Sequence, residues 1–252
     1  MFVVGAVLGV TQLRDTIYVV LGVVPVIWII NAKKTEQSYS TIIVNDFINK
    51  WPHDIVACER TSQVYVAGWG GCIWRVSSDG KDIRRWLWVA SRRCSLAVTS
   101  TRLLVTSRGL PQLIQFDAGG DELRRVQLPG DMRPRHAVES PTGTFIVSDY
   151  NRQVGEVNTG GEVLRQFSGS HLPSLDFNSH IAIDYRGNIF VADRDNHRIV
   201  LLDAHLTLRG VIIDEHQLNN MRPECLCYVK QSKQLLVGLY MGGVVAFDVL
   251  CR

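Results

Sequence analysis

Short runs in which hydrophobic and polar residues alternate fill most of the chain, and clusters of Gly, Asn and Asp separate them. The segment 180–213 shows the pattern: its hydrophobic runs at 181–184, 189–192, 198–202 and 206–213 are joined by short polar turns. A period of two residues with many Val and Ile residues is typical of β-strands. No segment shows a competing helical period, so we predict an all-β protein.

The predicted strands belong to a repeat. A hydrophobic run that contains a valine and precedes a turn occurs six times, at Val19, Val66, Val105, Val147, Val191 and Val237. The spacings between these valines are 47, 39, 42, 44 and 46 residues. A polar residue after the next hydrophobic run keeps nearly the same period, at Asn31, Ser77, Asp117, Asn158, Asp203 and Asp248. Periods of about 40–50 residues with four strands are those of propeller blades. The sequence therefore predicts one domain, residues 1–252, folded as a six-bladed β-propeller.

The two ends of the chain suggest how the ring closes. The last period ends soon after its third strand, so it lacks an outer strand. The apolar segment 2–8 precedes the first strand of the first period, and an unpaired apolar strand would be prone to aggregate. We expect this N-terminal strand to pair with the last blade and close the ring.

Two periods carry a recognisable motif. The segments 147–154 (VSDYNRQV) and 191–199 (VADRDNHRI) resemble the NHL repeat, in which a strand that ends in aspartate precedes an Asn-x-Arg-type turn. The first, third and sixth periods depart from this motif. The resemblance implies an NHL-type propeller like that of tripartite-motif proteins. NHL propellers include the C-terminal modules of tripartite-motif ubiquitin ligases, RNA-binding translational regulators and a lyase that completes peptide amidation.

Composition and cysteine usage narrow the class. Hydrophobic residues make up 46% of the chain and charged residues 20%, which is a globular balance. None of the six cysteines forms a C-x-x-C pair, so we expect reduced thiols and no zinc site of that kind. The apolar run 17–30 is shorter than the roughly 18 residues that a membrane helix needs. The N-terminus lacks the basic residues of a signal peptide, so we expect a cytoplasmic protein without a membrane partner.

The charge is unevenly distributed, and this predicts a binding face. Segment 81–135 contains eleven Lys or Arg and five Asp or Glu residues, a net charge of +6 in a chain of net +3. In a propeller, the loops that enter the innermost strands and those between the second and third strands share one face, and loops on a rigid scaffold often bind ligands. The residues we predict on that face are Trp69, Arg92, Arg93, Arg108, Arg133, Arg135, Tyr150, Asn151, Arg152, Arg194 and His197.

Three functions fit these residues, and we rank them in order. Aromatic and arginine side chains favour an interaction scaffold that binds a protein partner. The same arginines and rings could bind single-stranded RNA through Arg92, Arg93, Arg133 and Arg135.

The third function is a metal-dependent lyase or hydrolase. His136 and His180 each lie eleven residues before the valine of their blade, and His53 lies thirteen before Val66. Three such imidazoles could hold Zn²⁺. The ranking predicts a protein that is not an enzyme, with no cofactor and no small-molecule substrate.

Overall fold

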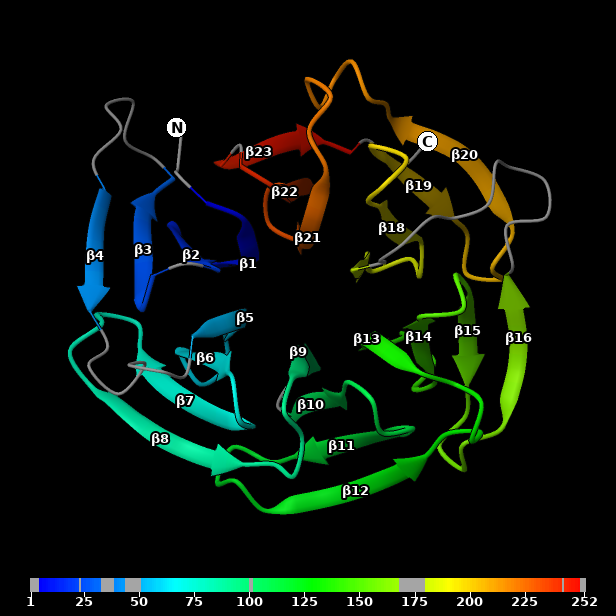
Figure 1. Ribbon diagram of the computed structural model, residues 1–252, viewed down its shortest axis with the longest axis horizontal. Coiled ribbons are helices and arrows are strands. Elements are labelled where there is room, and N and C mark those ends of the chain that lie inside the picture. The colour runs from blue at the N-terminus through cyan, green and yellow to red at the C-terminus, as the bar shows by residue number, and fades with distance from the viewer. Residues whose placement is uncertain are drawn as a thin grey trace.

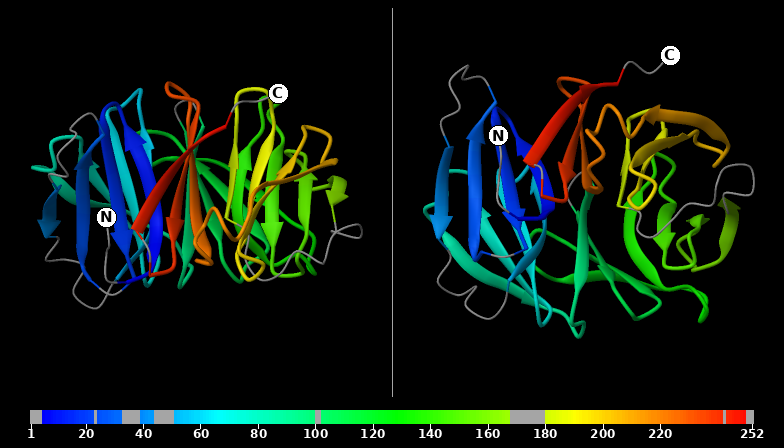
Figure 2. Two further views of the ribbon diagram at one scale, coloured as in Figure 1. Left: turned by 90° about the horizontal axis from the view of Figure 1, so that it is seen from above. Right: turned by 45° about the horizontal axis from the view of Figure 1, so that its top comes forward.

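The computed structural model describes residues 5–22, 24–32, 39–43, 51–99, 102–167, 180–241 and 243–249. Within these ranges the chain forms strands and turns and no helix, so no helix there is long and apolar enough to cross a membrane. Six antiparallel sheets surround a central axis (Figure 1). Seen from the side, the strands of the blades run across the thickness of a disc (Figure 2). The predicted six-bladed β-propeller is confirmed.

Each sheet is one blade, with its first strand nearest the axis. Blade 1 consists of β1 (Val7–Leu13), β2 (Thr16–Leu21), β3 (Val26–Asn31) and β4 (Tyr39–Ile43). Blade 2 consists of β5 (Pro52–Cys58), β6 (Gln63–Gly68), β7 (Cys72–Ser77) and β8 (Ile83–Trp88). Blade 3 consists of β9 (Cys94–Thr99), β10 (Arg102–Ser107), β11 (Gln112–Phe116) and β12 (Glu122–Gln127). Blade 4 consists of β13 (Pro134–Glu139), β14 (Phe145–Asp149), β15 (Val154–Val157) and β16 (Val163–Phe167). Blade 5 consists of β17 (Ile181–Ile183), β18 (Ile189–Asp193), β19 (Arg198–Leu202) and β20 (Leu208–Ile213). Blade 6 consists of β21 (Pro223–Val229), β22 (Gln234–Leu239) and β23 (Gly243–Asp248).

The first part of the N-terminal segment that we expect to close the ring lies outside the described residues, which begin at residue 5. In the described ranges blade 6 has three strands, and Val7 and Leu8, the end of that segment, begin β1, the innermost strand of blade 1. Val7 pairs with Leu21 on β2. Blades 1 and 6 also pack against each other, and the Cys225 thiol lies 3.6 Å from the carbonyl oxygen of Val7.

Hydrophobic contacts between neighbouring blades form the core. The largest completely buried side chain, Trp74, packs between blades 1 and 2 with Tyr18 and Ile27. A single sheet cannot bury both of its faces, so the blades are stable only when stacked around the ring. The five described cysteines are free thiols, as predicted, and Cys251 lies outside the described residues.

The motif that resembles an NHL repeat has a structural role in blades 4 and 5. Asp193 is completely buried, and its carboxylate accepts hydrogen bonds from Nδ2 of Asn196 at 3.0 Å and Nε of Arg198 at 2.6 Å. In blade 4, Asp149 accepts hydrogen bonds from the backbone N–H groups of Asn151 and Gln153. Side-chain carboxylates that bond to the backbone two residues ahead stabilise turns. The motif therefore fixes the turns that follow β14 and β18.

Four innermost strands have an extra residue near their first residue, on the same face of the propeller. Pairing shifts by one residue within β1, β5, β13 and β21, and the extra residues are Leu8, His53, Arg135 and Glu224. Such β-bulges redirect a side chain that regular pairing would leave on the sheet surface. All four redirected side chains line one cavity at the end of the central channel.

Two neighbouring glycines between β6 and β7 provide a test of the local fold. Gly70 and Gly71 have φ angles of 81° and 77°. A Cβ atom on Gly71 would lie 2.0 Å from the carbonyl oxygen of Val89, whereas one on Gly70 would meet nothing within 4 Å. We expect Gly71→Ala to lower the free energy of unfolding by about 2–5 kcal/mol, from the left-handed backbone and the clash together. Gly70→Ala should lower it by only about 1–2 kcal/mol, from the backbone alone. Urea denaturation of both variants would measure the difference, and equal losses would contradict the clash.

Candidate functional site: a basic channel mouth

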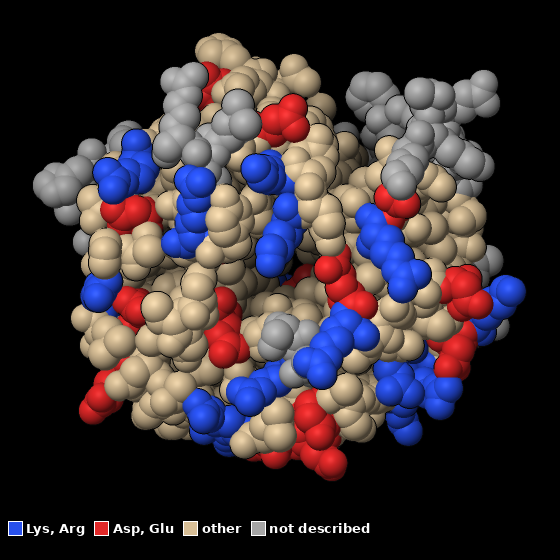
Figure 3. All heavy atoms as spheres, turned by 180° about the vertical axis from the view of Figure 1, so that it is seen from behind, with Lys and Arg blue, Asp and Glu red and all other residues tan. Residues whose placement is uncertain are grey.

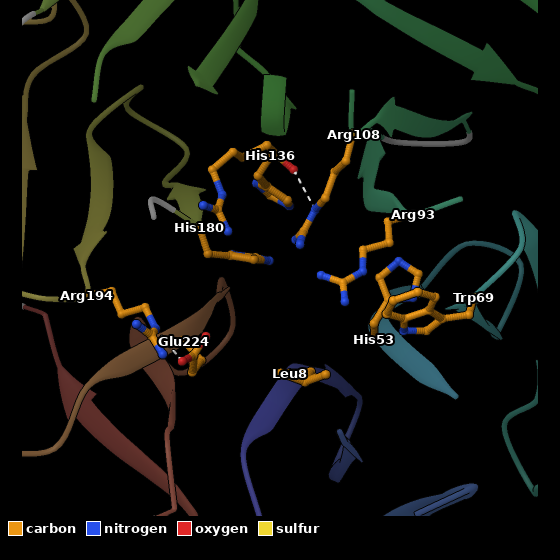
Figure 4. Close-up of a pocket in the computed structure, with 10 residues that line it drawn as sticks. Leu8, His53, Trp69, Arg93, Arg108, His136, His180, Arg194 and Glu224 are labelled. Atoms are coloured by element: carbon orange, nitrogen blue, oxygen red, sulfur yellow. Dashed lines mark hydrogen bonds and ion pairs between the residues drawn. The ribbon is translucent and has the colours of Figure 1, made fainter. Parts of the chain in front are cut away.

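A cavity of about 240 Å³ occupies one end of the central channel (Figure 4). We call it the inner cavity. Its lining residues come from all six blades: Leu8, His53, Trp69, Arg93, Arg108, Arg135, His136, His180, Arg194 and Glu224. Four of these residues are the bulge residues of the innermost strands, and others immediately follow a second strand. The radial arrangement thus brings together side chains that lie far apart in the sequence.

A second cavity of about 450 Å³ adjoins the first and opens more widely to solvent. We call it the outer cavity. It shares Trp69, Arg93 and Arg108 with the inner cavity and adds Arg92, Gly109, Arg133 and Tyr150. Trp69 and Tyr150 remain 40% and 37% exposed, so both rings can contact a ligand. The two cavities together form a funnel with an aromatic rim and a basic interior.

Three arginines in the funnel have no acidic partner. In the described part of the chain, no carboxylate lies within ion-pair distance of Arg93, Arg108 or Arg135. The guanidinium of Arg93 instead lies 4.1 Å from the Trp69 ring centre, and that of Arg135 lies 4.3 Å from the Tyr150 ring centre. Cation–π contacts orient a guanidinium without neutralising its charge.

The guanidinium groups of Arg93, Arg108 and Arg135 therefore repel one another. Burial and then the nearby Arg108 lower the pKa of Arg135 to about 10, and the same two causes lower the pKa of Arg93. Arg194 differs, because its guanidinium bonds Glu224 at 2.5 Å and Asp195 at 2.7 Å. The excess positive charge of the inner cavity therefore belongs to Arg93, Arg108 and Arg135.

The floor of the inner cavity is a layer of buried polar side chains. Asp54, His136 and His180 offer ligand atoms that all lie within 4.8 Å of one another, and the two imidazole rings stack with centres 3.8 Å apart. Beyond the two histidines lies a mainly apolar cavity of about 160 Å³. His136 and His180 therefore lie between the basic inner cavity and this second cavity.

The residue beside the two histidines is Asp54, not His53. Asp54 pairs with Ala67 in blade 2, and His136 pairs with Ser148 in blade 4. Asp54 and His136 therefore occupy equivalent positions in their blades. His53 is the bulge residue one position earlier, and its Nε2 lies 2.7 Å from the carbonyl oxygen of Cys94. His53, His136 and His180 all line the inner cavity, but the position equivalent to His136 is held by Asp54, because His53 occupies the bulge position that Arg135 occupies in blade 4.

Hydrogen bonding assigns the protons of the floor. Nε2 of His136 donates to the carbonyl oxygen of Leu96 at 3.2 Å, so its Nδ1 carries the lone pair. Nδ1 of His180 accepts the backbone N–H of Leu226 at 3.2 Å, so its Nε2 carries the proton in the neutral ring. That Nε2 lies 3.9 Å from Oδ1 of Asp54. A metal ion needs an unprotonated nitrogen, so His180 suits a hydrogen-bond donor better than a metal ligand.

Burial controls the charges of the floor residues. Burial would by itself raise the pKa of Asp54, but His180 and the N–H of Leu96 hold it below its usual range. Burial, and then His180, lower the pKa of His136 well below that of a free imidazole. Near neutral pH the floor therefore contains the Asp54 carboxylate and a neutral His136.

The structure gathers most of the predicted binding-face residues but not all of them. Trp69, Arg92, Arg93, Arg108, Arg133, Arg135, Tyr150 and Arg194 line the two cavities. Asn151, Arg152 and His197 do not line either cavity. Arg152 and His197 have left-handed backbones, with φ angles of 65° and 52°, and Nδ1 of His197 lies 2.7 Å from the carbonyl oxygen of Asn220. These three residues form turns.

Sequence reasoning missed Leu8, Asp54 and Glu224. Leu8 and Glu224 are the bulge residues that follow Val7 in β1 and Pro223 in β21. In the same way His53 follows Pro52 and Arg135 follows Pro134. Pro52, Pro134 and Pro223 thus mark the bulges in three blades, and a proline followed directly by a polar residue was the available signal. Leu8 has no such marker.

The fold and its channel define the class of this chain as a six-bladed β-propeller with a basic channel mouth. No family model matches the chain, and no curated protein matches its sequence. Solved structures do match its fold. A catalytically inactive virginiamycin B lyase from Staphylococcus aureus with quinupristin is 14% identical, covering 96% of this chain and 80% of the lyase with a TM-score of 0.70.

Two further structures show the same likeness. A protein of unknown function from Bacteroides thetaiotaomicron is 14% identical over 96% of this chain and 69% of its own, with a TM-score of 0.71. The WD40 β-propeller domain of Doa1 is 12% identical over 98% of this chain and 94% of its own, with a TM-score of 0.67. At such identities the likeness concerns the fold, which by itself does not determine function.

Proposed function

We propose that this propeller is an interaction scaffold whose channel mouth binds an acidic segment of a protein partner. The observation that carries the proposal is the convergence of Arg93, Arg108 and Arg135 without a described acidic partner. Like charges held together in a partly buried site destabilise one another. An anion that binds N–H groups of these guanidiniums would relieve the repulsion and form charge-assisted hydrogen bonds.

The aromatic rim supports a peptide as the ligand. Trp69 and Tyr150 are exposed beside the arginines, and aromatic and arginine residues dominate the binding energy of many protein interfaces. A cavity of about 240 Å³ has room for a side chain and not for a folded domain. The partner would therefore insert one acidic side chain while its flanking residues contact the rim.

RNA is the less favoured ligand. Trp69 and Tyr150 each already have a guanidinium over one ring face, and this limits stacking by bases. The side of the molecule opposite the view in Figure 1 shows acidic and basic side chains interspersed around a central hollow (Figure 3). Sequence-independent RNA binding relies on a positively charged groove that follows the backbone, and a narrow funnel is a different shape.

We also infer that the repeats are of the NHL type. Support comes from Asp149 and Asp193, whose carboxylates fix the turns in which the resemblance lies. The lyases among the similar structures make an enzyme the alternative to a scaffold. For that alternative, the Asp54 and His180 pair would be the acid–base group.

A labelled hexaglutamate peptide tests the proposed function. We expect it to bind the full chain in fluorescence anisotropy, with affinity that falls as salt rises. Arg93→Gln together with Arg135→Gln should weaken binding at least about tenfold, because hydrogen bonds to charged groups contribute about 1.5–3 kcal/mol each. The control, Arg102→Gln with Arg124→Gln, removes the same charge at exposed positions outside both cavities. Equal weakening by both pairs, or no binding at low salt, would contradict the proposal.

A further inference from the structure

We propose that the inner cavity recognises a phosphoryl group, so that the scaffold binds a phosphorylated peptide more tightly than one that is merely acidic. This inference rests on the proposed function and names the anion that the channel mouth selects. The observations that carry it are the charge of the cavity, the number of its unused donors and its shape.

The charge of the inner cavity matches a dianion better than a carboxylate. Glu224 and Asp195 already pair with Arg194, which leaves Arg93, Arg108 and Arg135 unneutralised in the described part of the site. A carboxylate supplies one negative charge, whereas a phosphate monoester supplies about 1.5–2 near neutral pH. The dianion would therefore relieve more of the repulsion among the three guanidiniums.

The inner cavity also offers more hydrogen-bond donors than one carboxylate can accept from. Nε of Arg108 bonds Oγ of Ser95 at 2.9 Å, and this fixes the side chain while leaving its two Nη groups for a ligand. Nε of Arg135 is buried and has no hydrogen-bond partner, and Nε2 of His180 lies 3.9 Å from Oδ1 of Asp54, beyond hydrogen-bond distance. Figure 4 shows Arg93, Arg108 and His180 extending toward the same central space. A phosphoryl group presents three terminal oxygens to donors arranged around it.

The shape of the site favours a phosphate at the end of a side chain. His136 and His180 lie between the inner cavity and the smaller cavity beyond it, and the outer cavity connects the inner one to solvent, so a ligand enters from the outer cavity. A phosphate monoester can enter end-on. A phosphodiester in RNA carries one charge and continues as chain on both sides, which fits a cavity of about 240 Å³ less well. The geometry therefore points to a phosphorylated side chain with flanking residues on Trp69 and Tyr150.

Three degenerate peptide pools test the inference. The pools share randomised flanking positions and differ only in a central phosphoserine, glutamate or serine, and anisotropy measures binding to the full chain. We expect the phosphoserine pool to bind at least about tenfold more tightly than the glutamate pool, because charge-assisted hydrogen bonds multiply with charge and acceptor number. The serine pool should bind weakest.

Two neighbouring arginines supply a matched pair of variants. Arg93 lines both cavities, whereas Arg92 lines only the outer one. Arg93→Gln should remove most of the preference for phosphoserine over glutamate, while Arg92→Gln should preserve it. Both side chains are exposed, so both variants should fold, and their circular dichroism spectra would verify this.

A pH series isolates the phosphoryl group. Its second pKa is about 6, so the ratio of phosphoserine to glutamate affinity should fall severalfold from about pH 7.5 to 5.5. The four arginines of the cavity stay charged over this range. Both pools meet the same protein at each pH, so the ratio of their affinities reports the charge of the phosphoryl group.

The outcomes separate this inference from the proposed function. Equal binding of the phosphoserine and glutamate pools, lost in Arg93→Gln, would overturn phosphoryl recognition and leave acidic-peptide binding intact. Absence of binding by both pools would overturn the two together. Tighter binding of a random single-stranded RNA pool than of the phosphoserine pool would also overturn the inference, in favour of RNA.

Discussion

Acidification from about pH 7.5 to 5 should lower the free energy of unfolding by about 4 kcal/mol through two buried histidines. Burial, and then Arg108, lower the pKa of His53 from 6.5 to about 4, and the pKa of His136 is well below its usual range. As the pH falls below about 6.5, the unfolded chain therefore takes up two protons that the folded chain does not bind. Stability is complete above that pH and decreases as the pH falls below it.

The size of this effect follows from proton linkage. One pH unit corresponds to about 1.36 kcal/mol per proton, so a fall from about pH 6.5 to 5 costs about 2 kcal/mol for each histidine. For His53 the loss continues until the pH reaches its folded pKa of about 4. Asp149 acts in the opposite direction, since burial raises its pKa. The test is therefore how much a single substitution changes the slope of the free energy of unfolding against pH.

Urea denaturation at several pH values gives that slope. His136→Gln should reduce the dependence of stability on pH between about 6.5 and 5 by close to one proton. His216→Gln is the matched control, because the His216 side chain is 83% exposed and its removal should leave the slope unchanged. The same slope in His136→Gln and in the unaltered protein would show that His136 becomes protonated in the folded state.

Asp193→Ala should lower the free energy of unfolding by about 3–5 kcal/mol. The carboxylate of Asp193 is completely buried and accepts hydrogen bonds from Asn196 and Arg198. Its removal leaves the guanidinium of Arg198, only 13% exposed, without that buried counter-ion. Loss of one partner of a buried ion pair is costly because the remaining charge stays desolvated.

Two further variants verify the cause. Asp193→Leu combined with Arg198→Met removes both charges of the pair and should recover much of the lost stability, because neither is then left without the other. Asp82→Ala breaks an exposed pair with Arg84 and should have little effect, because solvent screens such pairs. A loss after Asp193→Ala no larger than that after Asp82→Ala would contradict the role of the buried pair. Urea denaturation measures all three.

Local signals were sufficient to predict the blades. Each strand and turn depends on a few consecutive residues, and each hairpin joins neighbouring segments of the chain. The repeat of Val66, Val105, Val147, Val191 and Val237 therefore predicted the second strands, all of which the structure contains. The aspartates of blades 4 and 5 marked their turns for the same reason.

The site depended on finer features of the register. Shifting a strand by one residue turns every side chain to the opposite face. His53 occupies the bulge position that Arg135 occupies in blade 4, so Asp54, rather than His53, lies beside His136 and His180. Spacing from Val66 could not reveal this shift, because the length of the first hairpin varies among the blades.

Local alternation and composition were enough to establish the number of blades, their all-β character and the strong positive charge of residues 81–135. The positions of Leu8 and Glu224 at the channel mouth, and the neutralisation of Arg194 but not of Arg93, Arg108 and Arg135, became visible only in the folded chain. Radial packing brings together residues from opposite ends of the chain, and their charges interact through space irrespective of their separation in sequence.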